Sequence, residues 1–498
     1  MYHRGGRFTG AIVAAGVGSI YTLDELYWYR VVRRSMRAAY VGIYTVVNYK
    51  FLWNTDNAHE VNKRVAQAIT HCCLENEGLY VKIGQAIFSM AAILPKEYTE
   101  SLGRLLDKAK TYDYDVVAKI IDEELGPGVV TDIDPVPVGS ASLAQVHRGI
   151  YTATGEPVAI KIQKPNVSVQ AYWDLWMYRL LVRTLEWAFD IPLYWSVGFT
   201  CSHFMSELDF TLEGVNSELA KEQLAACLGD SVYVPRVVES RPRVLVTEWV
   251  DDTVMISNVK NLASRGFDCK RIVLDATKIF GNQIFKTGHV HCDPHPGNLL
   301  VRNHPSGDAG KHQIVLIDHG LYVELPEHLR NDYARLWVAM APPSDRATVE
   351  EICHKWGIGS VDLFQAIVRA GGNTKQKQPT STPVDDVIDP VDRAMLDKKR
   401  KRSAAELNAL VKENLKKLLQ DTSRFPRELI LVGRCMNYIR AANWTHGSPI
   451  DRVAVLANIA REATTDKPAA KSWLISVGST ILHYLPGGSA YHKEIEAS

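Results

Sequence analysis

The chain has 498 residues, of which 46% are hydrophobic and 23% charged, a composition typical of globular proteins that excludes collagenous or largely disordered ones. Its 57 basic residues against 56 acidic ones leave a formal charge of +1, so we expect no nucleic-acid partner, because binding a phosphate backbone needs a surplus of basic side chains. The eight cysteines form no C-x-x-C pair, which argues against a zinc finger or a redox dithiol and favours buried or half-buried thiols.

The first 53 residues concentrate positive charge, with seven basic side chains against two acidic ones, a local charge of +5. Residues 8–23 are uncharged, but a helix of that length, at about 1.5 Å per residue, extends only roughly 24 Å, short of the ~30 Å hydrocarbon core. The segment favours membrane association; a buried helical hairpin and a cleaved presequence are the alternatives. It is accompanied by aromatic residues of the kind found at headgroup level, namely Tyr27, Trp28, Tyr29, Tyr40, Tyr44 and Tyr49.

Helices and then strands are predicted next along the chain. Residues 57–92 have apolar side chains at helical spacing, and Pro95 ends that run. Residues 136–162 predict short strands separated by a turn at 154–156. Within them, 158–161 read V-A-I-K, a strand motif whose lysine reaches nucleotide phosphates in kinases.

The segment before that strand, 138–147, is rich in small residues. The chain contains neither G-x-G-x-x-G nor G-x-x-x-x-G-K-[ST], so it has neither a glycine-rich kinase loop nor a Walker A loop. Small side chains still let backbone amides approach phosphates, although Ala and Ser restrict φ more than Gly does. We therefore expect a different pose of the nucleotide.

An aromatic stretch at 172–199 separates these strands from the rest. We expect its tryptophans to serve core or interface packing and not a ligand cage. Residues 243–250 predict a buried strand that runs into a connector, and 268–288 predict a helix. The tryptophans concerned are Trp173, Trp176, Trp187 and Trp195.

The densest chemistry lies at 289–325. Residues 291–298 have the skeleton H-x-D-x-x-x-x-N, and D-H-G follows at 318–320, after an apolar strand. In kinases one Asp positions the attacking hydroxyl or water, while the Asn and a second Asp hold magnesium. The order of the motifs predicts Asp293 as catalytic base, Lys161 as phosphate clamp, and Asn298 with Asp318 as metal ligands.

Two departures from protein kinases are visible in the same region. Cys292 replaces the arginine that reads a phosphorylated activation loop, and no A-P-E sequence follows Asp318. His319 stands where kinases usually carry Phe. These differences argue against regulation by loop phosphorylation and against docking of a peptide substrate.

Beyond the kinase motifs the sequence turns polar and then basic. Residues 371–390 have few large apolar side chains and predict a disordered linker. Residues 397–420 predict a helix whose basic run at 398–402 is a solvated face or a contact with anionic lipid. A last apolar stretch at 472–485 predicts a packing or interfacial helix.

Together these motifs resemble the UbiB/ABC1/ADCK atypical kinases over about residues 60–345. Residues 82–85 are similar to the family's K-x-G-Q signature, and 138–147 to its Ala-rich loop. Glu207, Asp209 and Glu213 resemble its E-x-D element, and 291–298 match H-x-D-P-H-P-G-N without a break. The sequence is most similar to the ADCK1-like branch, which includes fungal relatives at the mitochondrial inner membrane.

The resemblance implies an α+β, protein-kinase-like two-lobed fold with an N-terminal helical extension over the active site. The implied divisions are a targeting or membrane segment (1–55), the helical K-x-G-Q extension (56–130), an N-lobe with a helical insertion (131–250), a C-lobe (251–370), a disordered linker (371–395) and C-terminal helices (396–498).

The site residues follow from the same resemblance. Lys82 and Gln85 are three apart on one helical face, so both could point into the nucleotide cleft. We expect Glu213 to pair with Lys161 across an insertion at about 165–204, and Glu207 with Asp209 to contact the K-x-G-Q helix or a metal. The expected nucleotide contacts are Lys82, Gln85, Val138, Gly139, Ser140, Ala141, Ser142, Gln145, Val146, Lys161, Glu213 and Glu248.

The implied function is that of a kinase or ATPase that binds ATP or ADP with Mg²⁺. Gly139 and Ser140 stand where many relatives carry Ala, which leaves the choice between ADP and ATP open. The expected partners are a nucleotide, a lipid or quinone-like small molecule and the mitochondrial inner membrane, in coenzyme Q or phospholipid homeostasis. The alternatives are a nucleotide-binding scaffold or lipid-handling protein without phosphoryl transfer and, third, a Ser/Thr protein kinase.

Overall fold

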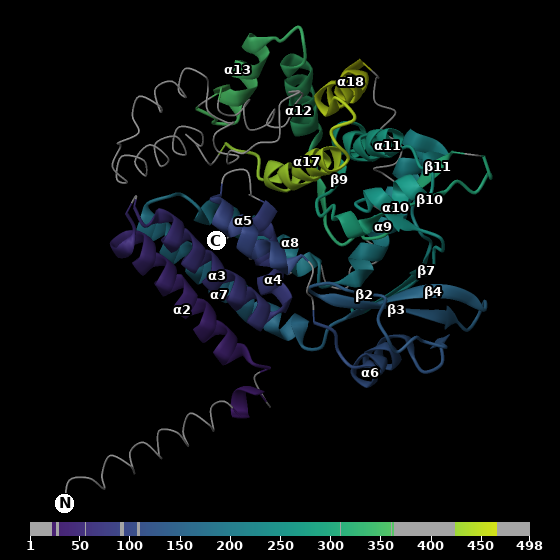
Figure 1. The fold of residues 1–498 in the computed structure, drawn as a ribbon, viewed down its shortest axis with the longest axis horizontal. Coiled ribbons are helices and arrows are strands. Elements are labelled where there is room, and N and C mark those ends of the chain that lie inside the picture. The colour runs from purple at the N-terminus through teal and green to yellow at the C-terminus, as the bar shows by residue number, and fades with distance from the viewer. Residues whose placement is uncertain are drawn as a thin grey trace, which may run out of the picture.

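A computed structural model of the chain describes residues 22–25, 29–54, 56–89, 94–106, 110–308, 310–359, 361–362 and 424–465. Three bodies are visible: a lobe built around a sheet, a mainly helical lobe, and a helical unit beside them (Figure 1). The predicted linker at 371–390, the basic helix at 397–420, the apolar stretch at 472–485 and most of the run at 8–23 lie outside the described residues.

The sheet of the N-terminal lobe has the strand order β1-β3-β4-β7-β6, with β2 paired to β3. Side chains alternate across β4, so Val158, Ile160 and Ile162 are buried while Lys161 points to the opposite face. Helix α6 (Tyr114–Leu125) packs on the buried face. The strands are β1 (Val130–Thr131), β2 (Gly139–Ser140), β3 (Ala144–Tyr151), β4 (Glu156–Gln163), β6 (Val237–Ser240) and β7 (Val244–Glu248).

Helix α9 (Phe210–Leu228) packs against β6 and β7. Asp209 is its N-cap and accepts a hydrogen bond from the backbone of Thr211, 3.0 Å away. Between β4 and α9 the chain forms α7 (Val167–Phe189), the short η3 (Tyr194–Ser196) and α8 (Val197–Ser206). The predicted helical insertion at 165–204 is confirmed.

The second lobe buries its core around Phe280 and Trp337. Its sheets are β5 (Val232–Tyr233), β11 (His312–Leu316), β10 (Leu299–Asn303) and β8 (Val254–Met255), in that order, and β12 (Tyr322–Glu324) with β9 (His289–His291). Its helices are α10 (Val259–Ser264), α11 (Cys269–Asn282), η5 (Gln283–Thr287), α12 (Glu327–Met340), α13 (Arg346–Lys355), α17 (Glu428–Thr445) and α18 (Arg452–Thr465). The predicted strand at 243–250 and helix at 268–288 are confirmed as β7 and as α11 with η5.

The helical unit combines N-terminal helices with α7 from the insertion (Figure 1). Its core joins Val61 and Val65 to Leu102, Leu105 and Met177. The N-terminal elements are α2 (Val31–Val47), η1 (Asn48–Leu52), α3 (Ala58–Asn76), α4 (Gly78–Ser89), α5 (Lys96–Leu102) and η2 (Gly103–Leu105). The helices predicted at 57–92 and the kinase-like, two-lobed α+β fold with a helical extension are confirmed.

Two expectations about side-chain packing have different outcomes. All eight cysteines are free, six of them buried and two half-buried, as predicted. Of the two predicted roles, core or interface packing, the core role is excluded for Trp173, Trp176 and Trp187, which are exposed because neighbouring helices cover other faces of α7; interface packing stays a prediction. Among the described residues, no helix has both the length and the apolar character needed to cross a membrane.

Candidate active site

Lys161 and Glu213 form an ion pair between β4 and α9. The Lys161 ammonium lies 2.6 Å and 2.8 Å from the two carboxylate oxygens of Glu213, as predicted. Burial alone would lower the pKa of Lys161, but the carboxylates of Asp318 and Glu213 outweigh it and raise the pKa. The lysine therefore stays charged where it could meet phosphate groups.

Asp318 completes this side of the site. Its Oδ2 lies 3.6 Å from the Lys161 ammonium, and its Oδ1 accepts a hydrogen bond from the Gly320 backbone at 2.9 Å. Burial would raise the pKa of Asp318, but the nearby Lys161 and Lys82 lower it to about 2. The carboxylate is therefore ionised at neutral pH.

His319 is held firmly behind Asp318. Its ring lies 2.9 Å from the Tyr322 hydroxyl and 3.2 Å from the Leu316 carbonyl, and its side chain is buried. Burial lowers the pKa of His319 to about 3, so the ring is neutral at physiological pH. These contacts fix the backbone on which Asp318 is carried.

Asp293 is clamped by two cations on the other side of the site. The Lys82 ammonium of α4 lies 2.5 Å from Oδ2, and the Arg434 guanidinium of α17 lies 2.6 Å from Oδ1. Burial would raise the pKa of Asp293, but Lys82 and Arg434 hold it far below its ordinary value. Lys82 also lies 2.8 Å from Glu207, so the expected contact between Glu207 and the K-x-G-Q helix is confirmed.

Asn298 lies between the two acidic groups. It ends the turn η6 (Pro296–Asn298), and its side-chain amide donates to the Asp293 carbonyl at 3.3 Å. The antiparallel pairing of β10 with β11 aligns Leu299 with Leu316, and the Ile317 backbone donates to the Asn298 carbonyl at 3.1 Å. This register places Asn298 next to the segment that carries Asp318.

The residues present fit magnesium. Asn298 and Asp318 offer amide and carboxylate oxygens, the donors that Mg²⁺ prefers, and phosphate oxygens of a nucleotide usually complete such a site. No group of three or more His, Cys, Asp and Glu side chains in the described part of the chain could hold a metal alone.

The sequence can be compared with known proteins on this basis. A family model described as the ABC1 atypical kinase-like domain matches residues 104–353. The chain belongs to the ABC1 atypical kinase family. An ABC1 family protein of Schizosaccharomyces pombe is 34% identical over 467 residues, which cover 92% of this chain and 83% of the relative.

Other ABC1 relatives carry kinase names. A Dictyostelium discoideum protein named probable serine/threonine-protein kinase is 30% identical, over 91% of this chain and 64% of its own length. AarF domain-containing protein kinase 1 of Gallus gallus is 34% identical, over 62% of this chain and 60% of its own. Among solved structures, the complex of Rv3197 with erythromycin from Mycobacterium tuberculosis matches with a TM-score of 0.42 and 22% identity, over 74% of this chain and 99% of that one.

The Ala-rich loop of this ABC1 protein lies on β2 and β3. Lys164 donates to the Ala141 carbonyl at 2.5 Å, and the Ser140 hydroxyl donates to the Lys110 carbonyl at 3.1 Å. Both contacts hold the loop in place through residues that lie outside it. Val138, Gly139 and Ala141 are exposed and Val146 is half-buried, whereas Ser142 is buried.

Gln145 holds the loop against the helical extension. Its amide accepts from the Tyr112 backbone nitrogen at 2.9 Å and donates to the Tyr112 carbonyl at 3.1 Å, and the side chain is fully buried. We predicted a nucleotide contact for Gln145. The structure instead gives its side chain a packing role, because both polar ends of the amide are engaged by one backbone segment.

Three further predicted residues are engaged elsewhere. Gln85 donates to the Leu105 carbonyl at 3.0 Å, so Lys82 reaches Asp293 while Gln85 holds η2. Glu248 accepts from the Tyr233 hydroxyl and, at 3.2 Å, from the Arg236 backbone. Asp209 caps α9. Its Oδ1 accepts hydrogen bonds from the backbone nitrogen and the hydroxyl of Thr211, which lies on α9 and not on the K-x-G-Q helix.

The sequence interpretation missed Arg434, which follows no kinase motif. One signal was available. In α17 the buried residues Leu431, Cys435 and Tyr438 recur at helical spacing, and Arg434 interrupts that apolar face. A charged residue in such a position needs a buried partner, and Asp293 is that partner.

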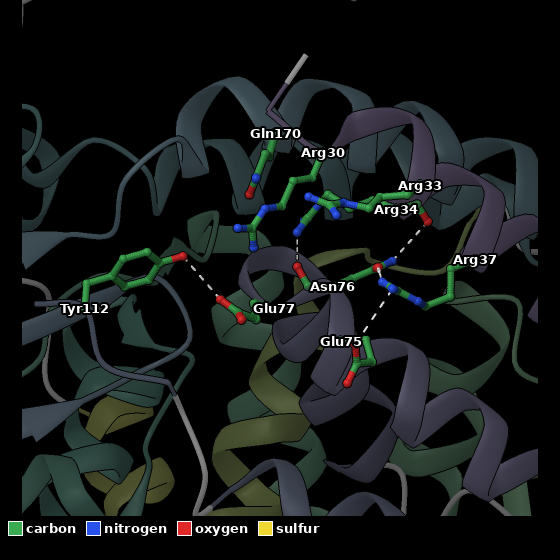
Figure 2. A pocket seen from close by; sticks show the side chains of 9 residues that line it. All are labelled: Arg30, Arg33, Arg34, Arg37, Glu75, Asn76, Glu77, Tyr112 and Gln170. Carbon is green, nitrogen blue, oxygen red and sulfur yellow. Dashed lines mark hydrogen bonds and ion pairs between the residues drawn. The ribbon is translucent and has the colours of Figure 1, made fainter. Parts of the chain in front are cut away.

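A polar pocket of about 280 Å³ lies away from these groups, in the helical unit (Figure 2). Its arginines are paired: Arg30 with Glu25 at 2.7 Å, Arg34 with Asp174, and Arg37 with Asn76. The pocket is therefore lined by polar pairs that link neighbouring helices, and we do not assign the phosphate chemistry to it. Its lining is Arg30, Arg33, Arg34, Arg37, Glu75, Asn76, Glu77, Tyr112 and Gln170.

Proposed function

We propose that this ABC1-family protein is a Mg²⁺-dependent atypical kinase or ATPase that binds ATP or ADP. The observation that carries the proposal is the contact of one lysine, Lys161, with the carboxylates of Glu213 and Asp318. Kinases use such a lysine on the α and β phosphates and such an aspartate on magnesium. The ABC1 family match supports the same assignment.

The residues have separate tasks in this proposal. Lys161 is oriented by Glu213 and donates hydrogen bonds to phosphate oxygens. Asn298 and Asp318 would hold Mg²⁺, which when bound neutralises negative charge on the transferring phosphoryl group. The exposed residues Val138, Gly139 and Ala141 lie on the loop that would approach the phosphates.

Asp293 acts mainly by orientation. Its low pKa makes it a weak proton acceptor, but phosphoryl transfer passes through a loose transition state in which the position of the nucleophile matters most. An ionised carboxylate can hold the O–H of an acceptor or of water by a hydrogen bond. Lys82 and Arg434 each engage one oxygen of Asp293, so an acceptor hydroxyl would have to use a remaining lone pair of the carboxylate or displace one of these contacts.

We further propose that the protein acts at the mitochondrial inner membrane, on a lipid or quinone-like small molecule, in coenzyme Q or phospholipid homeostasis. The support is the resemblance to the ADCK1-like branch and the basic, apolar N-terminus. The K-x-G-Q helix α4 adds support, because its Lys82 occupies Asp293 where a peptide hydroxyl would bind. A small acceptor needs less room than a peptide.

The test is nucleotide binding by the full chain, measured by calorimetry with Mg-ATP and Mg-ADP. Lys161→Ala and Asp318→Asn should each abolish or strongly weaken binding, whereas Lys119→Ala, at an exposed position on α6, should not. Unchanged binding in both site variants would overturn the assignment. Hydrolysis of ATP with and without cardiolipin-containing vesicles then measures turnover.

The double clamp on Asp293 also favours a second candidate, a nucleotide-binding scaffold or lipid-handling protein without phosphoryl transfer. Nucleotide binding without hydrolysis, even on anionic vesicles, would support it, as would full complementation of a null strain by Asp293→Asn. Phosphorylation of a protein partner that depends on Asp293 would instead support a Ser/Thr protein kinase.

A further inference from the structure

Helix α2 and the short η1 that follows it expose a row of large apolar side chains. The row follows spacings of three and four residues, so its members share one face of the helix. Each is between 39% and 73% exposed. The members are Met36, Tyr40, Ile43, Val47 and Phe51.

Helix α7 exposes a second such row, which includes most of the aromatic stretch seen in the sequence. Its members are between 44% and 80% exposed, and Trp187 is the most exposed of them. The spacing again confines them to one side of the helix. They are Val169, Tyr172, Trp173, Trp176, Leu180 and Trp187.

The two helices lie side by side and run in the same direction (Figure 1). Near their start, Arg34 of α2 pairs with Asp174 of α7, and near their end the Lys50 ammonium donates to the Ala188 carbonyl at 2.9 Å. The two rows therefore lie on neighbouring parallel helices, and each row is about 24 Å long at 1.5 Å per helical residue. We call these two rows the α2/α7 face.

The α2/α7 face has the size of the apolar patches that often have a function on monomeric proteins. An aromatic side chain has roughly 150–250 Å² to bury, so the half or more left exposed on Tyr40, Phe51, Tyr172, Trp176 and Trp187 amounts to about 500 Å² or more. The largest apolar patch on a typical monomer is about 300–600 Å², and patches of this size usually mark an interaction site. The aliphatic members enlarge it further.

The charge around the face selects the kind of partner. Residues 31–52 carry four basic side chains; Arg33, Arg34 and Arg37 pair with Glu25, Asp174 and Glu75, whereas Lys50 donates to a backbone carbonyl of α7. In α7, Asp174 is neutralised by Arg34 and Glu186 is half-buried, while Arg179 and Arg183 are exposed. Two cations adjoin aromatic rings: Lys50 lies 5.6 Å from the ring centre of Trp187, and Arg183 lies 4.9 Å from that of Tyr194. The complement of such a surface is apolar and anionic.

We infer that the α2/α7 face is the surface on which this protein lies on a bilayer that contains anionic lipids. Trp and Tyr favour the level of the lipid headgroups, and long basic side chains beside them reach the phosphates. Helices with one apolar face and basic flanks lie in the plane of the interface. This inference rests on the membrane part of the proposed function and gives it a specific surface.

The experiment is co-sedimentation of the full chain with phosphatidylcholine vesicles that contain or lack cardiolipin. A variant with Tyr40→Ser, Trp176→Ser and Trp187→Ser should reduce binding to both kinds of vesicle by about tenfold or more, because it removes apolar area that enters the interface. The matched control is Trp444→Ser, since Trp444 is 72% exposed on α17, outside the face, and it should bind as the wild type does.

A second variant separates charge from apolar contact. Lys50→Gln with Arg183→Gln should weaken binding to cardiolipin vesicles by about fivefold per charge, and leave binding to phosphatidylcholine unchanged. Circular dichroism and Mg-nucleotide affinity should not change in any variant, because the substituted groups lie outside the active site. Failure of the wild type to bind Mg-nucleotide would count against the proposed enzyme and not against this surface.

Three results would overturn the inference. Wild-type protein that fails to bind either vesicle would remove the membrane partner altogether. Wild-type binding retained by the triple variant would place membrane attachment in another segment, such as residues 8–23. A wild type that is dimeric in light scattering, with a monomeric triple variant, would show that a second copy of the chain covers the face.

Discussion

The Asp293 carboxylate and the Arg434 guanidinium lie 2.6 Å apart, although 141 positions of sequence separate the two residues. Helix α17 brings Arg434 to the catalytic loop because its apolar side packs on α11 and β9. Lys82 arrives at the same carboxylate from α4. Helix α17 of the C-terminal part and α4 of the helical extension thus both contact the side chain of Asp293.

Removal of the Arg434 charge should increase ATP hydrolysis by the proposed kinase or ATPase. In Arg434→Gln one oxygen of Asp293 is released, and the pKa of Asp293 should rise because the guanidinium helps to hold it low. A carboxylate that is both more accessible and more basic should increase kcat for ATP hydrolysis, on the order of tenfold. Steady-state hydrolysis measured as a function of pH provides the check.

Arg440→Gln is the matched control for that experiment. It removes the same charge from the same helix, and Arg440 is half-buried in α17, as Arg434 is. Its turnover should equal that of the wild type. A rate for Arg434→Gln equal to or below that of Arg440→Gln would mean that Arg434 supports the site instead of restraining it.

The ion pair between Lys161 and Glu213 should show strong energetic coupling. Lys161→Met leaves the nearly fully buried Glu213 carboxylate without its cation, which costs about 3–5 kcal/mol of unfolding free energy. The double variant Lys161→Met with Glu213→Gln removes both charges and should recover much of that loss. Urea denaturation of the wild type, both single variants and the double variant gives the coupling energy, and strictly additive losses would contradict a functional pair.

The same variant should have a distinctive pH dependence. Burial already raises the pKa of Glu213, and without Lys161, which opposes that effect, the pKa should rise further. A carboxyl whose pKa is higher in the folded state takes up a proton on folding, so its stabilising effect is present in acid and lost as the pH rises through the folded pKa. Lys161→Met should therefore approach the stability of the wild type as the pH falls from neutral. A difference that is constant with pH would argue against a buried charged Glu213.

Local patterns in the sequence predicted much of this site, and tertiary packing decided the rest. The V-A-I-K motif predicts a strand at 158–161, which is confirmed as part of β4, and Lys161 lies on the face opposite the buried Ile160 and Ile162. The rotation of α4 about its axis could not be predicted, because it depends on what η2 offers, and Gln85 therefore binds Leu105 and not the cleft.

The exposure of the α7 tryptophans likewise depends on tertiary packing. Spacing places Trp173, Trp176 and Trp187 on one side of the helix, but only the packed structure shows that α2, α4 and α8 cover other sides. Arg434 lay beyond any motif, since its role depends on how α17 packs against α11 and β9, which lie far earlier in the sequence.

Gly84, the glycine of the K-x-G-Q helix, lies so close to its neighbours that a side chain there would collide with them. A Cβ atom at this position would lie 2.3 Å from Cδ1 of Leu105 and 3.0 Å from Sγ of Cys73. Gly84→Ala should therefore push α4 away from η2 and α3, at a cost of about 1–3 kcal/mol. Because Lys82 is on the same helix, the displacement should also loosen its contact with Asp293.

Gly433→Ala on α17 is the comparison variant, since its Cβ meets no atom within 4 Å. Within a helix that substitution should stabilise the protein by about 0.5–1 kcal/mol. Thermal unfolding of both variants measures the difference, and ATP hydrolysis measures the release of Asp293. If Gly84→Ala unfolds at the wild-type temperature and hydrolyses ATP at the wild-type rate, then close packing of α4 is not what holds Lys82 on Asp293.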